Sequence, residues 1–369
     1  MPKASETVLE IDLSALEHNY RFLRSKLNPQ TKFLAVVKAF AYGSDAVAVA
    51  KKLESLQVDY LAVAYVREGV ALRDAGIKTP ILVLHPQANN FEELIERCLE
   101  PSLYAPKILK RFLEVAKKLG QKQYPVHIKF NTGLNRLGFG ENDIGLIQEI
   151  CKGRTEIKVT SLFSHLAASD DLNEEEFTRR QIDTFIKIAQ DFDKNTPQAP
   201  FKHLLNTSGI INYPEAQFDM VRCGIGLYGF GNEPEIDAAL KPIATLKTAI
   251  SQIHKIEPGE TVGYNRAFKA KGYKITATLP LGHADGIGRQ YGNGKAFVIV
   301  NSQKAPIIGN VCMDMIMIDI TDIDCKEGDE VIVFGKNQNA EEFAKGGNTI
   351  SYELLTSISQ RVKRSILDN

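Results

Sequence analysis

The feature that most constrains the fold is a series of eight short apolar runs between Phe33 and Gly224, each followed by a helix-like or turn-helix segment. The runs are FLAVVKA, YLAVAYV, ILVLH, PSLYA, VHIKF, VTSLFSHLA, HLLN and MVRCG. They are nearly continuous rather than alternately apolar and polar, which is typical of parallel strands covered on both faces. Eight such repeats over about 240 residues match the usual size of a (β/α)8 barrel. We therefore predict a TIM-type barrel over residues 1–240.

An open, doubly wound sheet is the alternative, but the G-x-G-x-x-G turn that it requires is absent after the first run. The residues before that run predict a short strand, VLEI, and then a helix. Ser14 and Glu17 form an S-x-x-E capping box, and apolar residues recur at helical spacing from Leu16 to Leu27. Because the first strand lies outside the eight runs, we allow for its pairing with a second domain.

The sequence pattern changes at about Leu240, where short strand-like runs begin to alternate with turn clusters such as PGE, NSQK and KEGD. This pattern predicts a mainly β domain over residues 241–369, so the fold class is α/β plus β. The tail NTISYELLTSISQRVKR predicts a closing helix. No low-complexity linker separates the two domains, which favours packed domains.

Composition favours a globular protein with a small ligand. Lys and Arg total 45, Asp and Glu total 45, and 24% charged with 44% hydrophobic residues excludes intrinsic disorder. Nucleic-acid binding needs a basic surplus that this chain lacks, so we expect no nucleic-acid partner. A small neutral or zwitterionic substrate fits the charge balance better.

The five cysteines are odd in number, scattered and never in a C-x-x-C pair. Neither a disulfide framework nor a metal site is predicted. The N-terminus lacks the basic and apolar regions of a signal peptide. No apolar run approaches the roughly eighteen residues of a membrane span, so we expect no membrane association and a cytoplasmic location.

Lys38 lies at the C-terminal end of the first apolar run, in AVVKAFAYG. In a barrel that end carries the active site, and lysine is rare in a buried strand without a partner. A desolvated lysine amine has a lowered pKa and can form a Schiff base as a neutral nucleophile. A lysine that extends from the strand end to solvent is equally compatible with this segment alone.

Polar residues and glycines follow the seventh and eighth runs, as NTSG at 206–209 and GIG at 224–226. Free backbone N–H groups in these two loops form the usual phosphate site of the barrel fold, although each glycine alone also fits an ordinary turn. A lysine after strand one with a phosphate site after strands seven and eight is the pair that pyridoxal 5'-phosphate needs.

With these residues and several further motifs, the sequence resembles alanine racemase, the barrel-fold family of pyridoxal-phosphate enzymes, over nearly the whole chain. The strongest motif is AVVKAFAYG, which is similar to the cofactor-lysine signature of the family. It is followed in the family's order by KFNTGLNRLGF, FSHLA, LNTSG, VRCGIGLYG, VGYNRAF, GHADG, GNVCMD and TISYEL.

The resemblance implies interconversion of L- and D-alanine by a two-base mechanism, which in bacteria supplies D-alanine for peptidoglycan. Lys38 would hold the cofactor as an aldimine and then act as the base on one face of the α-carbon. Tyr264 would be the base on the opposite face, because racemisation needs proton transfer on both sides. In the family this tyrosine reaches the active site of the other subunit, so a homodimer with shared sites is expected.

Arg222 is implied to face the pyridine nitrogen of the cofactor, with His165 fixing its orientation. Because arginine does not easily give up a proton, the ring nitrogen would stay unprotonated, which favours return of the proton to the α-carbon over transamination. The alternatives are a barrel-closing salt bridge for Arg222 and a structural role for His165.

The remaining roles also come from the resemblance. The phosphate site would comprise Tyr42, Asn206, Ser208, Gly224, Ile225 and Tyr352, although the two tyrosines also fit as ordinary amphipathic residues. Arg136 and the backbone of Met313, the latter from the partner subunit, would bind the substrate carboxylate. Lys129 is expected to be a carbamate that pairs with Arg136, with the plain amine as the alternative. Supporting roles fall to Cys312, Asp314 and His283.

The chain departs from the family pattern at several positions. Phe40 and Ser44 stand where an asparagine and a histidine are usual, His283 stands where many members have a tyrosine, and Lys363 stands where a proline is common. A serine or broad-range racemase of the same family is therefore the alternative activity. A barrel-fold decarboxylase is disfavoured by Arg222 and the short β domain, and a non-catalytic cofactor carrier would lack the β domain.

Overall fold

The computed structural model describes residues 6–194, 196 and 198–368. The chain forms two compact units. The barrel unit comprises Glu17–Ala41 and Ala46–Leu240, and the β unit combines Tyr42–Asp45 with the described parts of 1–16 and 241–369.

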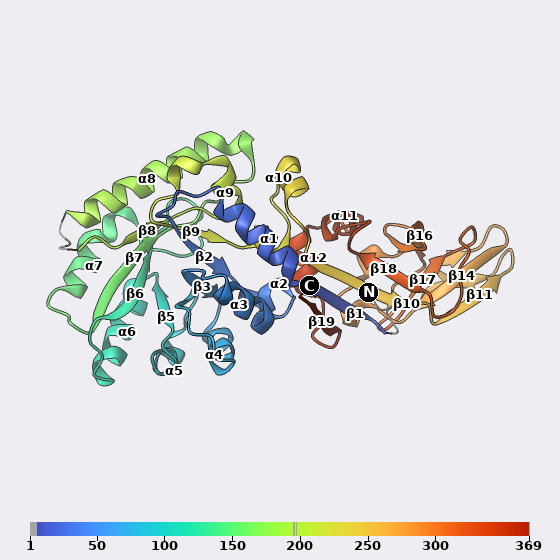
Figure 1. The fold of residues 1–369 in the computed structure, drawn as a ribbon, viewed down its shortest axis with the longest axis horizontal. Helices are drawn as coiled ribbons and strands as arrows, with labels where there is room; N and C mark the ends of the chain where they lie inside the picture. Colours follow the sequence, from blue (N-terminus) through green and yellow to red (C-terminus); the bar gives the residue numbers. More distant parts are fainter. Residues whose placement is uncertain (1–5, 195, 197, 369) are drawn as a thin grey trace. The chain divides into compact units, whose positions relative to one another are not determined.

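In the described part of the barrel unit, eight parallel strands close into a barrel in which β2 pairs with β9 (Figure 1). The strands are β2 (Lys32–Val36), β3 (Tyr60–Val63), β4 (Ile81–Val83), β5 (Glu100–Leu103), β6 (Tyr124–Lys129), β7 (Ile157–Phe163), β8 (Phe201–His203) and β9 (Met220–Cys223). Each overlaps one of the eight apolar runs, and every residue of β3, β4 and β9 is buried. The predicted TIM-type barrel is confirmed.

Helices alternate with these strands and cover the outside of the barrel (Figure 1). They are α3 (Ala46–Ser55), α4 (Val66–Asp74), α5 (Phe91–Glu96), α6 (Pro106–Lys118), α7 (Ile144–Cys151), α8 (Glu175–Asp193) and α9 (Thr207–Asn212). A further short helix, α10 (Pro234–Ala239), follows the last barrel strand. In α8, Ile182, Phe185 and Ile188 are buried at spacings of three, so one stripe of this helix faces the core.

Helix α1 (Leu13–Arg24) begins one residue before the predicted capping box. The backbone N–H of Ala15 donates to Asp12 Oδ1 at 2.9 Å, so Asp12 rather than Ser14 provides the cap. Glu17 instead pairs with Arg21 and Lys52. The predicted cap was wrong because the helix begins at Leu13, which places Asp12 immediately before its first turn, where its carboxylate accepts the Ala15 N–H.

The described residues of the β unit build a nine-stranded mixed sheet in the order β11-β14-β17-β16-β15-β18-β10-β1-β19. Strand β1 (Val8–Asp12) runs antiparallel to β10 (Ala244–Ala249) and parallel to β19 (Lys363–Leu367). The other strands are β11 (Gln252–Ile256), β14 (Lys274–Leu279), β15 (Phe297–Val300), β16 (Gln303–Ile308), β17 (Ile316–Asp319) and β18 (Glu330–Phe334), with β12 (Thr261–Val262) and β13 (Phe268–Lys269) forming a separate pair. The mainly β second domain is confirmed as a fold class.

The predicted closing helix is only partly correct. Two short helices, α11 (Ala340–Gly346) and α12 (Ser351–Ser357), precede the last strand, and the chain then extends as β19. The pairing with β1 explains the difference, because without β19 the edge of β1 would present unpaired backbone groups.

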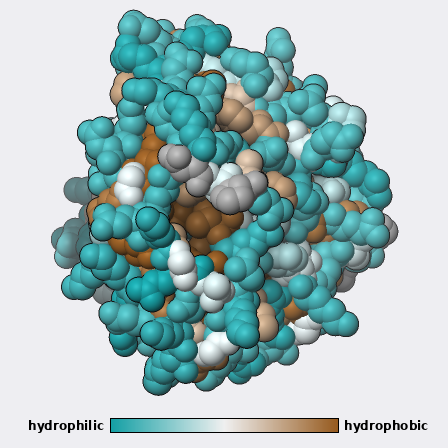
Figure 2. All heavy atoms as spheres, turned by 90° about the vertical axis from the view of Figure 1, so that its left-hand side faces the viewer, coloured by the Kyte–Doolittle hydropathy of each residue, from teal (hydrophilic) through white to brown (hydrophobic). Residues whose placement is uncertain are grey.

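Among the described residues, no helix combines the length and the apolar character that crossing a membrane requires. Figure 2 shows one face of the molecule, which is mostly hydrophilic, with apolar residues gathered in a hollow near its centre.

The cap on α1 gives a stability prediction. Replacing Asp12 with Ala should lower the free energy of unfolding by about 1 kcal/mol, because the Ala15 N–H loses its acceptor. Asp12→Asn is the matched control and should stay near the parent protein, since asparagine caps as well as aspartate. Chemical unfolding followed by circular dichroism measures both, and equal losses in the two variants would contradict the assignment.

Candidate active site

The C-terminal ends of the barrel strands bring together most of the polar residues predicted from the sequence. Lys38 follows β2, Lys129 ends β6, His165 follows β7 and Arg222 lies in β9. Arg136, from the loop after β6, is exposed. In barrel enzymes this end of the strands carries the active site.

Lys38 is followed by an unusual backbone turn, α2 (Lys38–Tyr42). Ala39, Phe40, Ala41 and Tyr42 all have φ between 53° and 55°, which is the left-handed region. Such a conformation costs an L-residue roughly 1–2 kcal/mol, so the surrounding structure has to hold this turn in place.

Glu68, in the first turn of α4, provides part of that hold. Its Oε1 accepts the Ala39 N–H at 2.6 Å, and its Oε2 accepts the N–H groups of Ala64 and Tyr65 at 2.7 and 2.9 Å. The sequence reasoning missed Glu68. The available signal was a glutamate at the third position of a helix, where a carboxylate often satisfies free backbone N–H groups.

The positive groups at these strand ends affect one another. Burial, and then the charge of Arg136, lower the pKa of Lys38. Burial, followed by Arg136, Arg222 and Lys38, lowers the pKa of Lys129 to about 8. Burial and the same four cations hold the pKa of His165 well below its usual value. The site therefore concentrates positive charge, and an anionic ligand would relieve this repulsion.

Arg222 is buried and donates several hydrogen bonds. Its NH2 group donates to the carbonyl oxygens of Ser164 at 2.6 Å and Leu204 at 2.8 Å, and lies 3.2 Å from His165 Nδ1. Its NH1 group lies 3.0 Å from Nδ1 of His203. Burial lowers the pKa of Arg222 to about 9, so the group is still a cation at neutral pH. The predicted contact with His165 is present, and His203 is an additional partner that the sequence reasoning missed.

The loops after β8 and β9 are joined by Thr207, which the sequence reasoning also left without a role. Thr207 Oγ1 accepts the N–H groups of Gly224 at 3.3 Å and Gly226 at 3.2 Å. A Cβ on Gly226 would lie 2.6 Å from the Thr207 methyl carbon, so a side chain there would force the two loops apart.

The predicted phosphate residues of the barrel unit lie on these two loops. Asn206 caps α9 by accepting the Gly209 N–H at 2.9 Å, and the Ser208 hydroxyl accepts a hydrogen bond from Asn232 at 3.0 Å. Gly224 and Ile225 begin the short 3-10 turn Ile225–Tyr228. The first N–H groups of such turns have no acceptor within their own helix.

In the β unit, Tyr42 and Tyr352 lie together, with ring centroids 6.1 Å apart. Gly43 is required beside them, because it has φ +79° and a Cβ there would lie 1.9 Å from the carbonyl oxygen of Leu355. The two tyrosines predicted for the phosphate site are therefore held by neighbouring segments of the β unit.

Among the described residues of the β unit, Tyr264 and Met313 are the most exposed large apolar side chains, at 70% and 59%. The carbonyl oxygen of Tyr264 accepts a hydrogen bond from Asn310 at 3.0 Å. Asp314 pairs with Arg361 at 2.7 Å, and Arg361 also binds Asp285 through two hydrogen bonds. Asp314, which follows Met313 in the chain, is thus held in place by Arg361.

The GHADG turn packs against the segment that contains Met313. The N–H groups of His283 and Ala284 donate to the carbonyl oxygens of Cys312 and Met313, both at 3.0 Å. A Cβ on Gly282 would lie 2.4 Å from each of these carbonyl oxygens, so only glycine fits. His283 and Cys312 therefore support the Met313 backbone through main-chain contacts.

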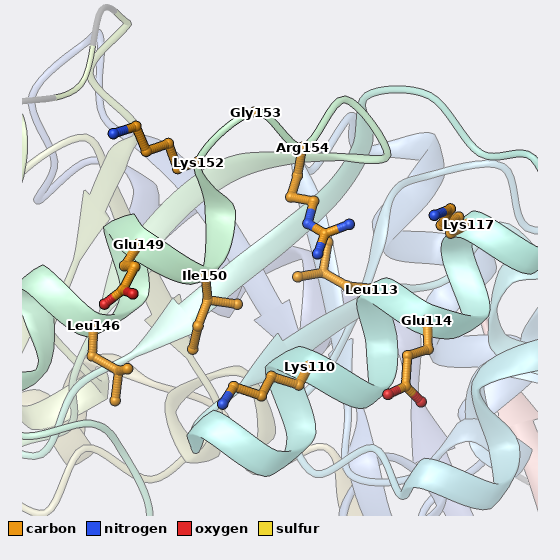
Figure 3. Close-up of a pocket in the computed structure, with 10 residues that line it drawn as sticks. All are labelled: Lys110, Leu113, Glu114, Lys117, Leu146, Glu149, Ile150, Lys152, Gly153 and Arg154. Atoms are coloured by element: carbon orange, nitrogen blue, oxygen red, sulfur yellow. The ribbon is translucent and has the colours of Figure 1, made fainter.

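A separate surface groove lies between α6 and α7 (Figure 3). Its lining includes Lys110 and Lys117 of α6 and Glu149 and Ile150 of α7. None of the predicted site residues lines it. We therefore place the candidate site at the carboxyl ends of the barrel strands, not on these outer helices.

Two family models match the chain. The alanine racemase N-terminal domain matches residues 11–232, and the alanine racemase C-terminal domain matches residues 243–366. The alanine racemase of Clostridium perfringens is 38% identical over 366 residues, covering 96% of this chain and 94% of that protein.

Solved structures agree with this relationship. The alanine racemase of Clostridium difficile 630 has a TM-score of 0.92 and 36% identity, covering 99% of this chain and 96% of that one. The alanine racemase of Bartonella henselae, described with covalently bound pyridoxal phosphate, has a TM-score of 0.88 and 29% identity over 98% of this chain and 99% of that one. With both domains matched and relatives that are racemases, a class of isomerase, the chain belongs to the alanine racemase family.

Proposed function

We propose that this protein racemises L- and D-alanine with pyridoxal 5'-phosphate as cofactor, and so supplies D-alanine for peptidoglycan. The observation that carries the proposal is Lys38, an amine of lowered pKa at the end of β2, within a cluster of cations at the strand ends. The proposed cofactor is supported by the related alanine racemase of Bartonella henselae, whose description names covalently bound pyridoxal phosphate. The cytoplasmic location stays a prediction.

The residues present fit this cofactor. Burial, and then the charges of Arg222, Arg136, Lys129 and Lys38, depress the pKa of His165, so positive charge predominates around it. A phosphate would supply a balancing negative charge, and an aldehyde would find in Lys38 an amine whose lowered pKa favours its nucleophilic neutral form. The expected phosphate ligands are the Ser208 hydroxyl, the side chain of Asn206, the backbone N–H groups at Gly224 and Ile225, and the hydroxyls of Tyr42 and Tyr352. The Gly224 N–H would exchange its 3.3 Å contact with Thr207 Oγ1 for the phosphate.

When bound, the cofactor would withdraw electrons from the α-carbon of the amino acid and so acidify its α-proton. The Lys38 amine would take or return that proton on one face of the α-carbon. The Tyr264 hydroxyl would do so on the opposite face. We propose that Tyr264 acts from a second copy of the chain, in a homodimer with shared sites, and its exposure in the single chain supports this.

Arg222 would face the ring nitrogen of the cofactor as a cation. Because its pKa stays well above neutral, Arg222 donates a hydrogen bond there without giving up a proton. That arrangement favours return of the proton to the α-carbon, which is the outcome that a racemase needs.

Arg136 and the backbone N–H of Met313 would hold the substrate carboxylate. Arg136 is exposed, and its charge reaches Lys38, so a carboxylate on Arg136 would lie close to the proposed base. The small methyl group of alanine is the proposed specificity, and a serine or broad-range racemase is the alternative.

The activity is tested by incubating cofactor-loaded protein with single enantiomers of alanine, serine and other amino acids and following the chirality. We expect alanine to racemise fastest, and the rate to depend on added cofactor. Faster racemisation of serine would replace the proposal with its alternative. Omission of the cofactor and a Lys38→Ala variant are the controls, and both should abolish the reaction.

The two-base assignment predicts an asymmetric defect in Tyr264→Phe. We assign Tyr264 to the face from which L-alanine loses its proton and Lys38 to the face from which D-alanine does. Removal of the hydroxyl should therefore slow proton abstraction from L-alanine by about 100-fold or more, while abstraction from D-alanine by Lys38 is affected less. The rates of α-proton exchange from each enantiomer measure this. Equal defects for both enantiomers, or loss of the cofactor from the variant, would contradict the role of Tyr264.

The lowered pKa of Lys129 makes carbamate formation testable. A group whose pKa falls to about 8 is partly a neutral amine at pH 7.5, and only the neutral amine attacks carbon dioxide, forming an N–C bond and releasing a proton. With 13C-bicarbonate, NMR should show a carbamate carbon whose intensity rises as the pH increases from 6 to 8. The Lys129→Arg variant should lack this signal, and a signal of equal strength there would assign it elsewhere.

A further inference from the structure

A chain of buried polar side chains extends from Arg222 through the barrel. Arg222 NH1 lies 3.0 Å from His203 Nδ1, and His203 Nε2 lies 2.8 Å from Ser161 Oγ. Ser161 Oγ lies 2.6 Å from His127 Nδ1, and His127 Nε2 lies 2.7 Å from Glu100 Oε2. We refer to Glu100, His127, Ser161 and His203 as the relay.

The five residues come from five successive strands, β5 to β9, with one residue on each strand. His127, Ser161 and His203 are fully buried, and Glu100 begins β5 with a side chain that is 12% exposed. The relay therefore connects the N-terminal end of β5 with the cation at the active end of the barrel.

With each imidazole carrying a single proton, the chemistry of the two ends fixes the direction of every hydrogen bond. A guanidinium has no acceptor, so His203 Nδ1 must accept from Arg222, and His203 Nε2–H must donate to Ser161. The Ser161 hydroxyl then donates to His127 Nδ1, and His127 Nε2–H donates to Glu100. A carboxylate at that end is an acceptor, so the two ends require the same order.

The surroundings hold the imidazoles in these orientations. Phe163 stacks on His203 with ring centroids 4.8 Å apart, and the Arg222 guanidinium lies over the same Phe163 ring. Burial and the nearby Arg222 charge keep the pKa of His203 well below its usual value, which leaves its Nδ1 free to accept. Tyr60 lies edge-on to His127, and burial followed by the nearby Glu100 carboxylate raises the pKa of Tyr60.

We propose that Glu100, acting through His127, Ser161 and His203, is a positioning residue for Arg222 in the racemisation reaction. The Glu100 carboxylate polarises the hydrogen bonds of the relay, all of which donate toward Glu100. Hydrogen bonds in series strengthen one another in a buried environment. His203 then accepts strongly from NH1 and keeps the guanidinium in one orientation. This inference rests on the proposed function, in which Arg222 faces the ring nitrogen of the cofactor.

Ser161→Ala breaks the relay at its centre with little change in volume, and Ser102→Ala is its matched control. Ser102 is also buried in a barrel strand, β5, but its Oγ has no hydrogen-bond partner within the described part of the chain. Loss of the Ser102 hydroxyl should therefore leave the relay intact. Glu100→Gln removes the charge at the far end with little change in shape.

The first readout is NMR of the cofactor-loaded protein with 15N-labelled histidine, which does not depend on activity. In the parent protein and in Ser102→Ala, His127 and His203 should both be neutral, with the proton on Nε2 and a bare Nδ1. In Ser161→Ala the Nδ1 signal of His127 and the Nε2–H signal of His203 should shift, since each loses its partner. A proton on His203 Nδ1 in the parent protein would overturn the proposal.

The second readout is the fraction of turnovers that end in transamination, in which alanine leaves as pyruvate and its amino group stays on the cofactor, converting the aldehyde to an amine. This fraction reports how Arg222 is held. We expect this fraction to rise roughly fivefold in Ser161→Ala, the size expected for loss of one ordinary hydrogen bond, and to rise in Glu100→Gln as well. Ser102→Ala should match the parent protein.

If the relay variants and Ser102→Ala give the same pyruvate fraction, the positioning role is wrong. If the parent protein does not racemise alanine, the proposed function fails instead, and the histidine signals still report the proton order. If Ser161→Ala does not fold, Glu100→Gln alone decides, and an unchanged pyruvate fraction in that variant would overturn the proposal.

Discussion

The buried guanidinium of Arg222 is the constraint around which the active end of the barrel is arranged. A cation taken out of water must be hydrogen-bonded. Arg222 meets that requirement with the carbonyl oxygens of Ser164 and Leu204 and with the two histidines His165 and His203. These partners lie on or next to β7 and β8, so the registry of neighbouring strands determines where the cation points.

A second constraint is the concentration of positive charge next to Arg222. The Lys38 and Lys129 amines keep lowered pKa values because water is excluded and cations surround them. The cations that add to the effect of burial also make the site attractive to phosphate and carboxylate groups. The turn after Lys38 is strained, and the hydrogen bond from the Ala39 N–H to Glu68 helps to hold it. The fold therefore maintains a locally unfavourable backbone conformation next to this lysine.

The barrel could be predicted because its signal is local and repeated: each buried strand is a continuous apolar run with a helix after it. The positions of Lys38 and Arg222 at strand ends could be predicted because each follows or lies in a recognisable apolar run, while their roles in the reaction stay predictions. The cap at Asp12 and the final strand β19 could not be predicted, since each depends on which of several possible partners pairs with a free backbone group in the folded structure.

The relay was missed for a related reason. Glu100, His127, Ser161 and His203 are single polar residues in otherwise apolar strands, separated by 27 to 42 positions along the chain. Only the closed barrel and its strand register bring them into hydrogen-bonding distance. A sequence motif describes neighbours in the chain, whereas this network joins neighbours across strands.

The central claim is that this chain exchanges the α-proton of alanine and returns it to either face. The most direct measurement is incubation of the cofactor-loaded protein with pure L-alanine or pure D-alanine in deuterated water, with chirality and α-deuterium followed together. The account predicts that each enantiomer gives the other and that the newly formed enantiomer carries α-deuterium. Release of carbon dioxide, or alanine that keeps both its chirality and its α-proton, would contradict it.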